Sequence, residues 1–179
     1  MKIIRDALSE EIISFCVDVY KKLDYSKLSP TFMWWPENLK HGQIAGPFVT
    51  PVPPNVVDRL LPEIQEHIWT WEGEFEFTFQ YYIWGPNSGI ADHDDAGHDV
   101  GATLYLNNFP LNYGGLFVYG DDNDDLNVVA PTRNTLVVND QKERHWVTTV
   151  SSQANFPRCT IQIWGKRARL SETKQVNVT

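Results

Sequence analysis

The feature that most constrains the fold of this chain is a run of residues, 74–84, in which apolar side chains alternate with others. Every second residue of this run is apolar: Phe75, Phe77, Phe79, Tyr81 and Ile83. Successive side chains of a strand point to opposite faces, so these positions share one face. We therefore expect a long strand whose apolar face packs on helices. Its mixed face, with Gln80, Tyr82 and Trp84, would line a cavity.

Shorter strand-like runs follow, separated by turns rich in Gly, Pro, Asn and Asp. They cover residues 100–107, 116–119, 128–131, 134–138, 143–147 and 158–164. Two helices precede them. The first covers 9–24 with Ser9 as N-cap, and the second covers 55–69, where Pro62 should interrupt the helix. Prolines make 26–54 irregular. This order predicts a mainly β protein, a double-stranded β-helix or jelly roll with N-terminal packing helices. We expect one domain, in which 1–72 support a core at 73–168.

Composition excludes several classes of partner. The net charge of −8 disfavours a nucleic-acid binder. Two cysteines are too few for a disulfide framework, so a reducing, cytoplasmic location is expected. The N-terminus lacks the apolar core of a signal peptide, and no run is long enough to span a bilayer. No membrane or nucleic-acid partner is expected.

The chemistry is concentrated in the stretch IADHDDAGHD, residues 90–99. In an extended segment, His93 and Asp95 would project to the same side. An imidazole and a carboxylate aimed at one point are two of the three ligands of a 2-His-1-carboxylate Fe(II) site. The triplet H-x-D is common by chance, so it indicates an iron site only if a second histidine and a residue that binds an anion follow downstream. His145, at the start of a later strand, can be that histidine.

Arg158 opens the last predicted strand and shares a face with Thr160. A guanidinium inside an apolar barrel is costly unless it is paired. A dicarboxylate would supply the partner through a bidentate contact, with a hydroxyl from Thr160 or Tyr105.

Five pieces in this order resemble the Fe(II)/2-oxoglutarate-dependent dioxygenases, and among them the prolyl 4-hydroxylase group. These pieces are His93-Asp94-Asp95, Tyr105-Leu106-Asn107, Gly114-Gly115-Leu116, His145-Trp146-Val147 and the run 158–164, and the matched region is about 75–166. The resemblance implies Fe(II) held by His93, Asp95 and His145. It implies 2-oxoglutarate held by Arg158 with Tyr105 and Thr160, O₂ as oxidant and ascorbate as a reductant. It places Tyr82, Trp84, Gln80 and Trp164 at the substrate pocket.

The chain departs from the family pattern in two places. Trp84 stands where many relatives have a tyrosine, and the interval between His145 and Arg158 is longer, an excess that we assign to the loop 151–157. His98 is a rival ligand, but His93 follows the strand directly and is two residues from Asp95. Because Asp95 is a carboxylate rather than a small residue, hydroxylation is favoured over halogenation.

Three functions remain open. The favoured one is hydroxylation of a prolyl residue in a peptide or protein, with the segments 46–54 and 121–125 flanking the substrate. The second is the same mechanism on a free amino acid or other small molecule. The third is a non-catalytic jelly-roll binding module.

Overall fold

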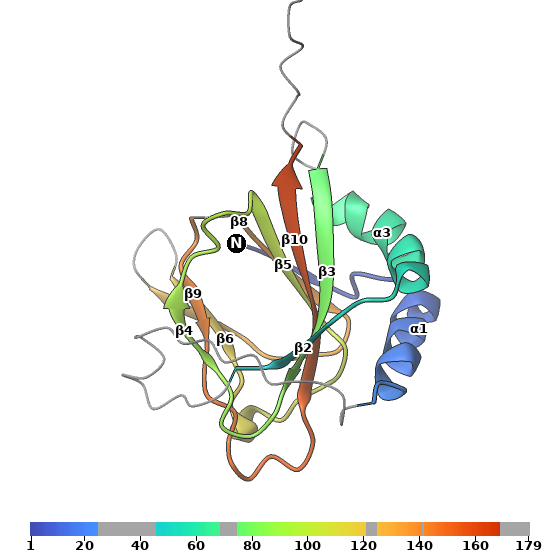
Figure 1. Ribbon diagram of the computed structural model, residues 1–179. Coiled ribbons are helices and arrows are strands. Elements are labelled where there is room, and N and C mark those ends of the chain that lie inside the picture. The colour runs from blue at the N-terminus through green and yellow to red at the C-terminus, as the bar shows by residue number, and fades with distance from the viewer. Residues whose placement is uncertain (25–45, 69–74, 121–124, 141, 169–179) are drawn as a thin grey trace, which may run out of the picture.

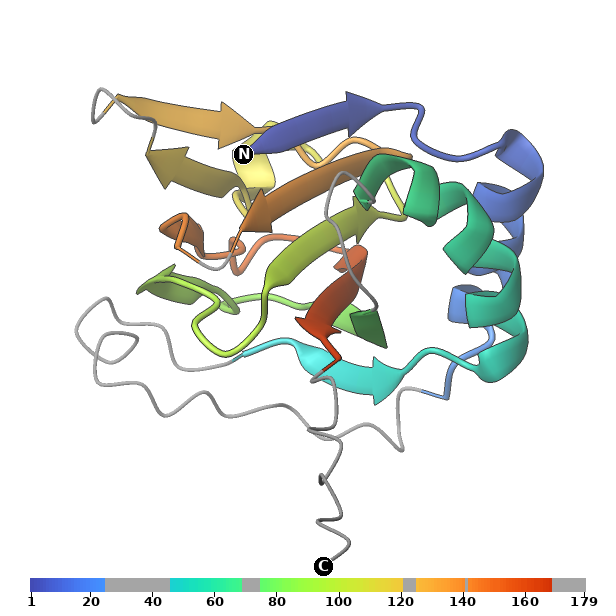
Figure 2. The same ribbon diagram turned by 90° about the horizontal axis from the view of Figure 1, so that it is seen from above.

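A computed structural model describes residues 1–24, 46–68, 75–120, 125–140 and 142–168. Within these residues, strands form two antiparallel sheets that face each other, and helices cover the outer side of the larger sheet (Figures 1 and 2). This is the predicted double-stranded β-helix. None of the described helices has the length and apolar character needed to cross a membrane.

The larger sheet has the strand order β1-β8-β5-β10-β3-β2. Its strands are β1 (Lys2–Arg5), β2 (Phe48–Pro51), β3 (Phe75–Trp84), β5 (Val100–Tyr105), β8 (Thr135–Asp140) and β10 (Arg158–Arg167). The smaller sheet has the order β4-β9-β6-β7. Its strands are β4 (Ile90–His93), β6 (Phe117–Gly120), β7 (Leu126–Val129) and β9 (His145–Val147). A short 3₁₀ turn, η2 (Leu111–Tyr113), precedes β6.

The prediction for the alternating run is confirmed. Strand β3 runs beside β10 over its whole length, with Trp84 opposite Arg158 and Phe75 opposite Arg167. Tyr81 and Ile83 lie in the main core with the apolar residues of both helices. On the other face of β3, Tyr82 and Trp84 belong to a second core between the sheets.

Helix α1 (Glu10–Lys21) begins as predicted. The hydroxyl of Ser9 accepts a hydrogen bond from the backbone N–H of Ile12 and donates one to Glu63 of the second helix. Glu10 and Glu11 occupy the first turn, where they complement the positive end of the helix dipole.

The second helix, α3 (Pro54–Ile68), corrects one expectation: Pro62 lies inside it and does not interrupt it. Proline removes a backbone donor and crowds the preceding turn. The stripe Val56, Leu60, Ile64 and Ile68 is buried on the main core, and each such side chain gains about 1.5–3 kcal/mol from burial. Tertiary packing on both sides of Pro62 therefore outweighs its local cost.

Three strands were not predicted. Strand β1 pairs with β8, and β2 pairs with β3, so segments expected to be helical or irregular supply both edges of the larger sheet. Pro51 is compatible with β2 because an edge strand leaves one side unpaired. Strand β4 contains the first part of the acidic stretch. Most of the predicted loop 121–125 lies outside the described residues.

Candidate metal and cosubstrate site

Strands β4 and β9 bring together two histidines that are distant in sequence. His93 is the direct partner of His145 in this antiparallel pair, so both side chains lie on the same face. Their ring centroids are 4.4 Å apart. The Nδ1–H of His93 donates to the carbonyl of Ala91 at 2.8 Å, and that of His145 to the carbonyl of Glu143 at 2.9 Å. These bonds leave both Nε2 atoms as acceptors, which is the state that binds a metal.

Asp95 completes the cluster from the turn after β4. Its Oδ1 lies 3.8 Å from Nε2 of His93, and its Oδ2 lies 3.8 Å from Nε2 of His145. One ligand atom from each residue lies within 4.8 Å of the other two. The donor set of two imidazoles and one carboxylate suits a divalent transition metal such as Fe(II).

The surroundings keep both imidazoles neutral. Burial lowers the pKa of His93, and the neighbouring His145 lowers it further. Burial also lowers the pKa of His145, which is 5% exposed. The ring of Phe117 lies 4.9 Å from that of His145 and nearly parallel to it. Neutral imidazoles can donate a lone pair to a metal without first losing a proton.

Arg158 lies deeper between the sheets and is only 1% exposed. Its Nη2 donates to the hydroxyl of Tyr105 at 3.2 Å. Its guanidinium carbon lies 5.0 Å from the ring centroid of Trp84 and 4.9 Å from that of Tyr105. Among the described residues, Nε and Nη1 of Arg158 are buried side-chain atoms that find no hydrogen-bond partner. A buried cation with unused donors points to an anionic ligand.

Gly115 explains part of the glycine motif. Its φ of +65° is left-handed, and a Cβ there would come within 3.1 Å of Cδ of Arg158 and of Cγ2 of Val150. Glycine therefore satisfies the turn and leaves room for the arginine stem.

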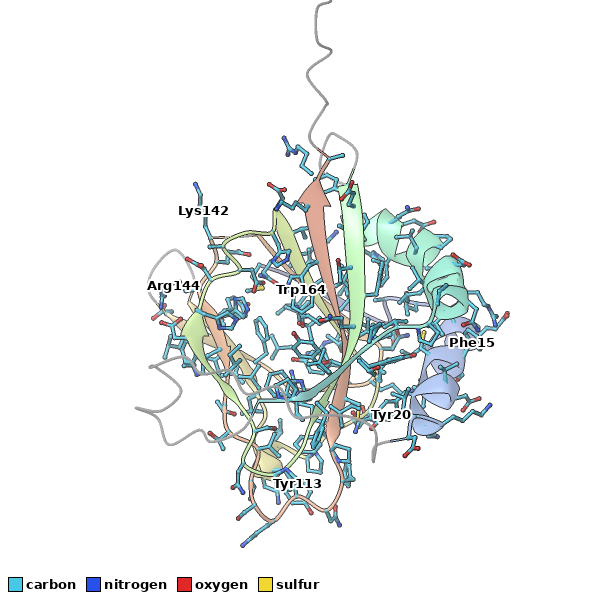
Figure 3. The ribbon with its side chains drawn as sticks, in the orientation of Figure 1. Phe15, Tyr20, Tyr113, Lys142, Arg144 and Trp164 are labelled. Carbon is cyan, nitrogen blue, oxygen red and sulfur yellow. The ribbon has the colours of Figure 1, made fainter. Side chains whose placement is uncertain are left out.

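A cavity of about 220 Å³ connects the His–Asp–His cluster with Arg158. Tyr82, Trp84, Thr160 and Trp164 are among the residues that line it. Figure 3 shows Trp164 pointing from β10 into the space between the sheets, whereas Arg144 lies on the outer side. Tyr105, expected beside the cosubstrate, is not among the described residues that line the cavity; its hydroxyl accepts the hydrogen bond from Arg158. Gln80 was also expected at the pocket, because it shares a face of β3 with Tyr82. It is not among the described residues that line the cavity.

Sequence reasoning missed other lining residues: Ile90, Thr103, Phe117, Val147 and Gln162. Gln162 could have been found, because it alternates with Thr160 and Trp164 on β10. The hydroxyl of Thr103 donates to its side-chain oxygen at 2.8 Å. Phe117 and Val147 carried no signal, since their position depends on how the two sheets face each other.

His98 lies outside the cluster. Its ring stacks on Trp164 at a centroid distance of 5.5 Å, and its backbone N–H donates to the carbonyl of Asp95. His98 forms part of the cavity wall, but it does not belong to the group of converging ligand atoms. The geometry therefore favours His93 as the ligand. Trp84, in the position of the expected tyrosine, donates from Nε1 to Thr160 at 3.4 Å.

Comparison with protein families gives one match, to the 2OG-Fe(II) oxygenase superfamily over residues 77–166. The chain belongs to this superfamily. The matched region contains the His–Asp–His cluster, Arg158 and all the cavity residues named above. No curated protein sequence matches the chain significantly.

Solved structures of oxygenases share the fold. A prolyl-4-hydroxylase from Pseudomonas putida has a TM-score of 0.70 at 18% identity, with 93% of this chain and 92% of that chain covered. A prolyl hydroxylase from Trichoplax adhaerens, in complex with a peptide of hypoxia inducible factor, has a TM-score of 0.67 at 16% identity, covering 93% and 83%.

The non-heme alpha ketoglutarate dependent epimerase SnoN of nogalamycin biosynthesis has a TM-score of 0.70 at 12% identity, covering 93% and 77%. Relatives with different reactions are thus similar to this oxygenase in backbone. The fold alone does not assign a reaction.

Superfamily membership implies Fe(II) and 2-oxoglutarate, and the residues present fit both. The cluster offers a suitable donor set for the metal. The unpaired donors of Arg158 offer a place for a carboxylate at the far end of the same cavity.

Proposed function

We propose that this chain is a single-domain Fe(II)- and 2-oxoglutarate-dependent dioxygenase that hydroxylates a C–H bond of a prolyl residue in a peptide or protein. One observation carries the proposal: a His–Asp–His cluster shares a cavity with a buried arginine that has unused donors. An incidental set of buried polar groups would normally satisfy its hydrogen bonds internally.

Each residue of the site has a defined role in this proposal. His93, Asp95 and His145 hold Fe(II). Arg158, with Tyr105 and Thr160, holds the distal carboxylate of 2-oxoglutarate. When bound, the metal and cosubstrate supply the oxygen activation that side chains cannot perform, with 2-oxoglutarate consumed to succinate and CO₂. The aromatic walls exclude water from the reacting C–H bond.

The charges of the cavity favour a residue within a peptide over a free amino acid. Among the described lining residues, Arg158 is the one permanent cation, whereas Asp94 and Asp95 are acidic. If Arg158 holds the cosubstrate, no described cation is left for the carboxylate of a free amino acid. A residue within a chain has no such charge to neutralise.

The aromatic wall suits a prolyl ring. Tyr82 lies edge-on to Trp164 at a centroid distance of 5.6 Å, and His98 stacks on the same indole. These rings present apolar surface without a charged anchor, which matches an uncharged pyrrolidine. The peptide bound to the Trichoplax enzyme is consistent with this class of substrate.

The first experiment measures turnover without substrate. Purified protein with Fe(II), O₂ and 2-oxoglutarate should release succinate slowly, and His145→Ala should abolish this release. His67→Ala is the matched control, because His67 lies on α3 and bonds the carbonyl of Ala7, remote from the cavity. Bound iron without succinate above the His145→Ala background would instead support a non-catalytic binding module.

The second experiment identifies the substrate class. Proline-containing peptides and free proline are incubated with the enzyme and examined by mass spectrometry for the gain of one oxygen atom. We expect oxygen on the peptides alone. Oxygen on free proline alone would support the small-molecule reaction.

A further inference from the structure

Asp95 is the least constrained of the three proposed ligands by the backbone. His93 and His145 lie on paired strands, and each ring is fixed by a bond to a carbonyl. Asp95 lies beyond the end of β4. A bond from the backbone N–H of His98 closes its turn, but that bond does not orient the carboxylate.

Asn139 supplies the missing contact. Its side-chain Nδ2 donates to Oδ2 of Asp95 at 2.9 Å. Asn139 lies on β8 in the larger sheet, is 2% exposed, and reaches across to a residue that follows β4 of the smaller sheet. The contact therefore ties the proposed metal site to both sheets.

Gly101 makes room for this contact. It is the direct partner of Asn139 on β5. A Cβ at residue 101 would lie 2.4 Å from Oδ2 of Asp95 and 3.0 Å from both polar atoms of the Asn139 amide. Any other residue at this position would have to displace the carboxylate or the amide.

We propose that Asn139 is a positioning residue that orients the carboxylate of Asp95 for metal binding, and that Gly101 is required for this arrangement. The amide bond engages Oδ2. Because Oδ1 faces Nε2 of His93 and Oδ2 faces Nε2 of His145, this bond fixes how the carboxylate presents itself to both imidazoles. This inference rests on the proposed function, because it takes Asp95 as a ligand. Outer contacts of this kind commonly change metal affinity by about 10–100-fold.

The test is a titration of metal-free protein with Co(II), an oxygen-stable substitute for Fe(II), followed by calorimetry and visible absorption. Asn139→Ala removes the donor, and Asn139→Leu removes it with little change of volume. Gly101→Ala keeps the donor and fills the space. We expect all three to weaken Co(II) binding roughly 10–100-fold, and to change the absorption bands that report coordination.

Val138→Ala is the matched control. Val138 precedes Asn139 on β8 but packs in the main core, so its truncation should lower thermal stability and leave Co(II) affinity unchanged. Wild-type affinity in both Asn139 variants would overturn the positioning role. An equal loss of Co(II) affinity in Val138→Ala and Asn139→Ala would also overturn the positioning role. Failure of the wild-type protein to bind Co(II) would count against the proposed function itself.

Discussion

Arg158→Met should move the stability of the cosubstrate-free protein and its affinity for 2-oxoglutarate in different directions. Two donors of this buried guanidinium have no partner among the described residues. A buried unsatisfied donor costs about 1–3 kcal/mol, whereas stacking on an aromatic ring returns about 0.5–2 kcal/mol. Replacing a buried charge with an apolar side chain of similar size is often neutral or stabilising. We therefore expect the unfolding temperature without cosubstrate to stay constant or rise.

The affinity for 2-oxoglutarate should change by a much larger amount than the stability. Hydrogen bonds to charged groups contribute about 1.5–3 kcal/mol each. Loss of a bidentate contact should then cost about 3 kcal/mol or more, which is about 100-fold in affinity. At a 2-oxoglutarate concentration of about 100 times the wild-type dissociation constant, the ligand stabilises wild type by about 2.7 kcal/mol. That corresponds to an increase of roughly 5–11 °C in unfolding temperature for a chain of this size.

The variant at the same concentration would be about half saturated. It would gain about 0.4 kcal/mol, or roughly 1 °C. The assay is thermal unfolding of protein loaded with Co(II), with and without 2-oxoglutarate. Arg133→Met is the control, because Arg133 forms its ion pair with Glu10 at the surface. A destabilised Arg158→Met protein that retained the full ligand shift would refute the reasoning, since Arg158 would then be a structural residue.

Three further predictions concern stability and thiol reactivity. Hydrogen bonds from Arg133 and Ser14 lower the pKa of Glu10 to about 2, so the stabilisation from this pair is present above the unfolded pKa and is lost as pH falls from 4.5 toward 2. Acid unfolding of Glu10→Gln should show a shallower slope there, and an unchanged slope would contradict the ion pair. Burial raises the pKa of Cys16 to about 11 and that of Cys159 to about 12. Iodoacetamide should therefore modify neither thiol in native protein and both in denaturant, as mass spectrometry would show. Leu60→Ala, at a site with 0% exposure, should destabilise the protein by about 2–5 kcal/mol in urea unfolding, and a loss below about 1 kcal/mol would contradict its place in the core.

The charge distribution of the cavity also limits the charge that the proposed substrate can carry. One permanent cation lies in its described wall, and the proposed cosubstrate uses that cation. Substrate selection would then depend on shape and on the rings of Tyr82 and Trp164. The other charged groups of the described wall, Asp94 and Asp95, are acidic and cannot pair with an anionic substrate.

The sequence by itself determined the elements whose signals are local. Alternation over 74–84 predicted β3 and the face it buries, and the same period on β10 placed Arg158 and Thr160 on one side. The N-cap at Ser9 predicted the start of α1. The spacing of His93 and Asp95, with the later His145, predicted the cluster that the fold brings together.

Only the tertiary structure decided the features that depend on a distant partner. Strands β1 and β2 exist because β8 and β3 offer them hydrogen bonds, and α3 continues through Pro62 because its apolar stripe is buried on the core. Nothing near Asn139 in sequence marks it as a neighbour of Asp95. That contact requires two sheets to face each other and a Cβ to be absent at Gly101. Periodicity records which face a side chain occupies, but the opposing surface that it meets is set by packing.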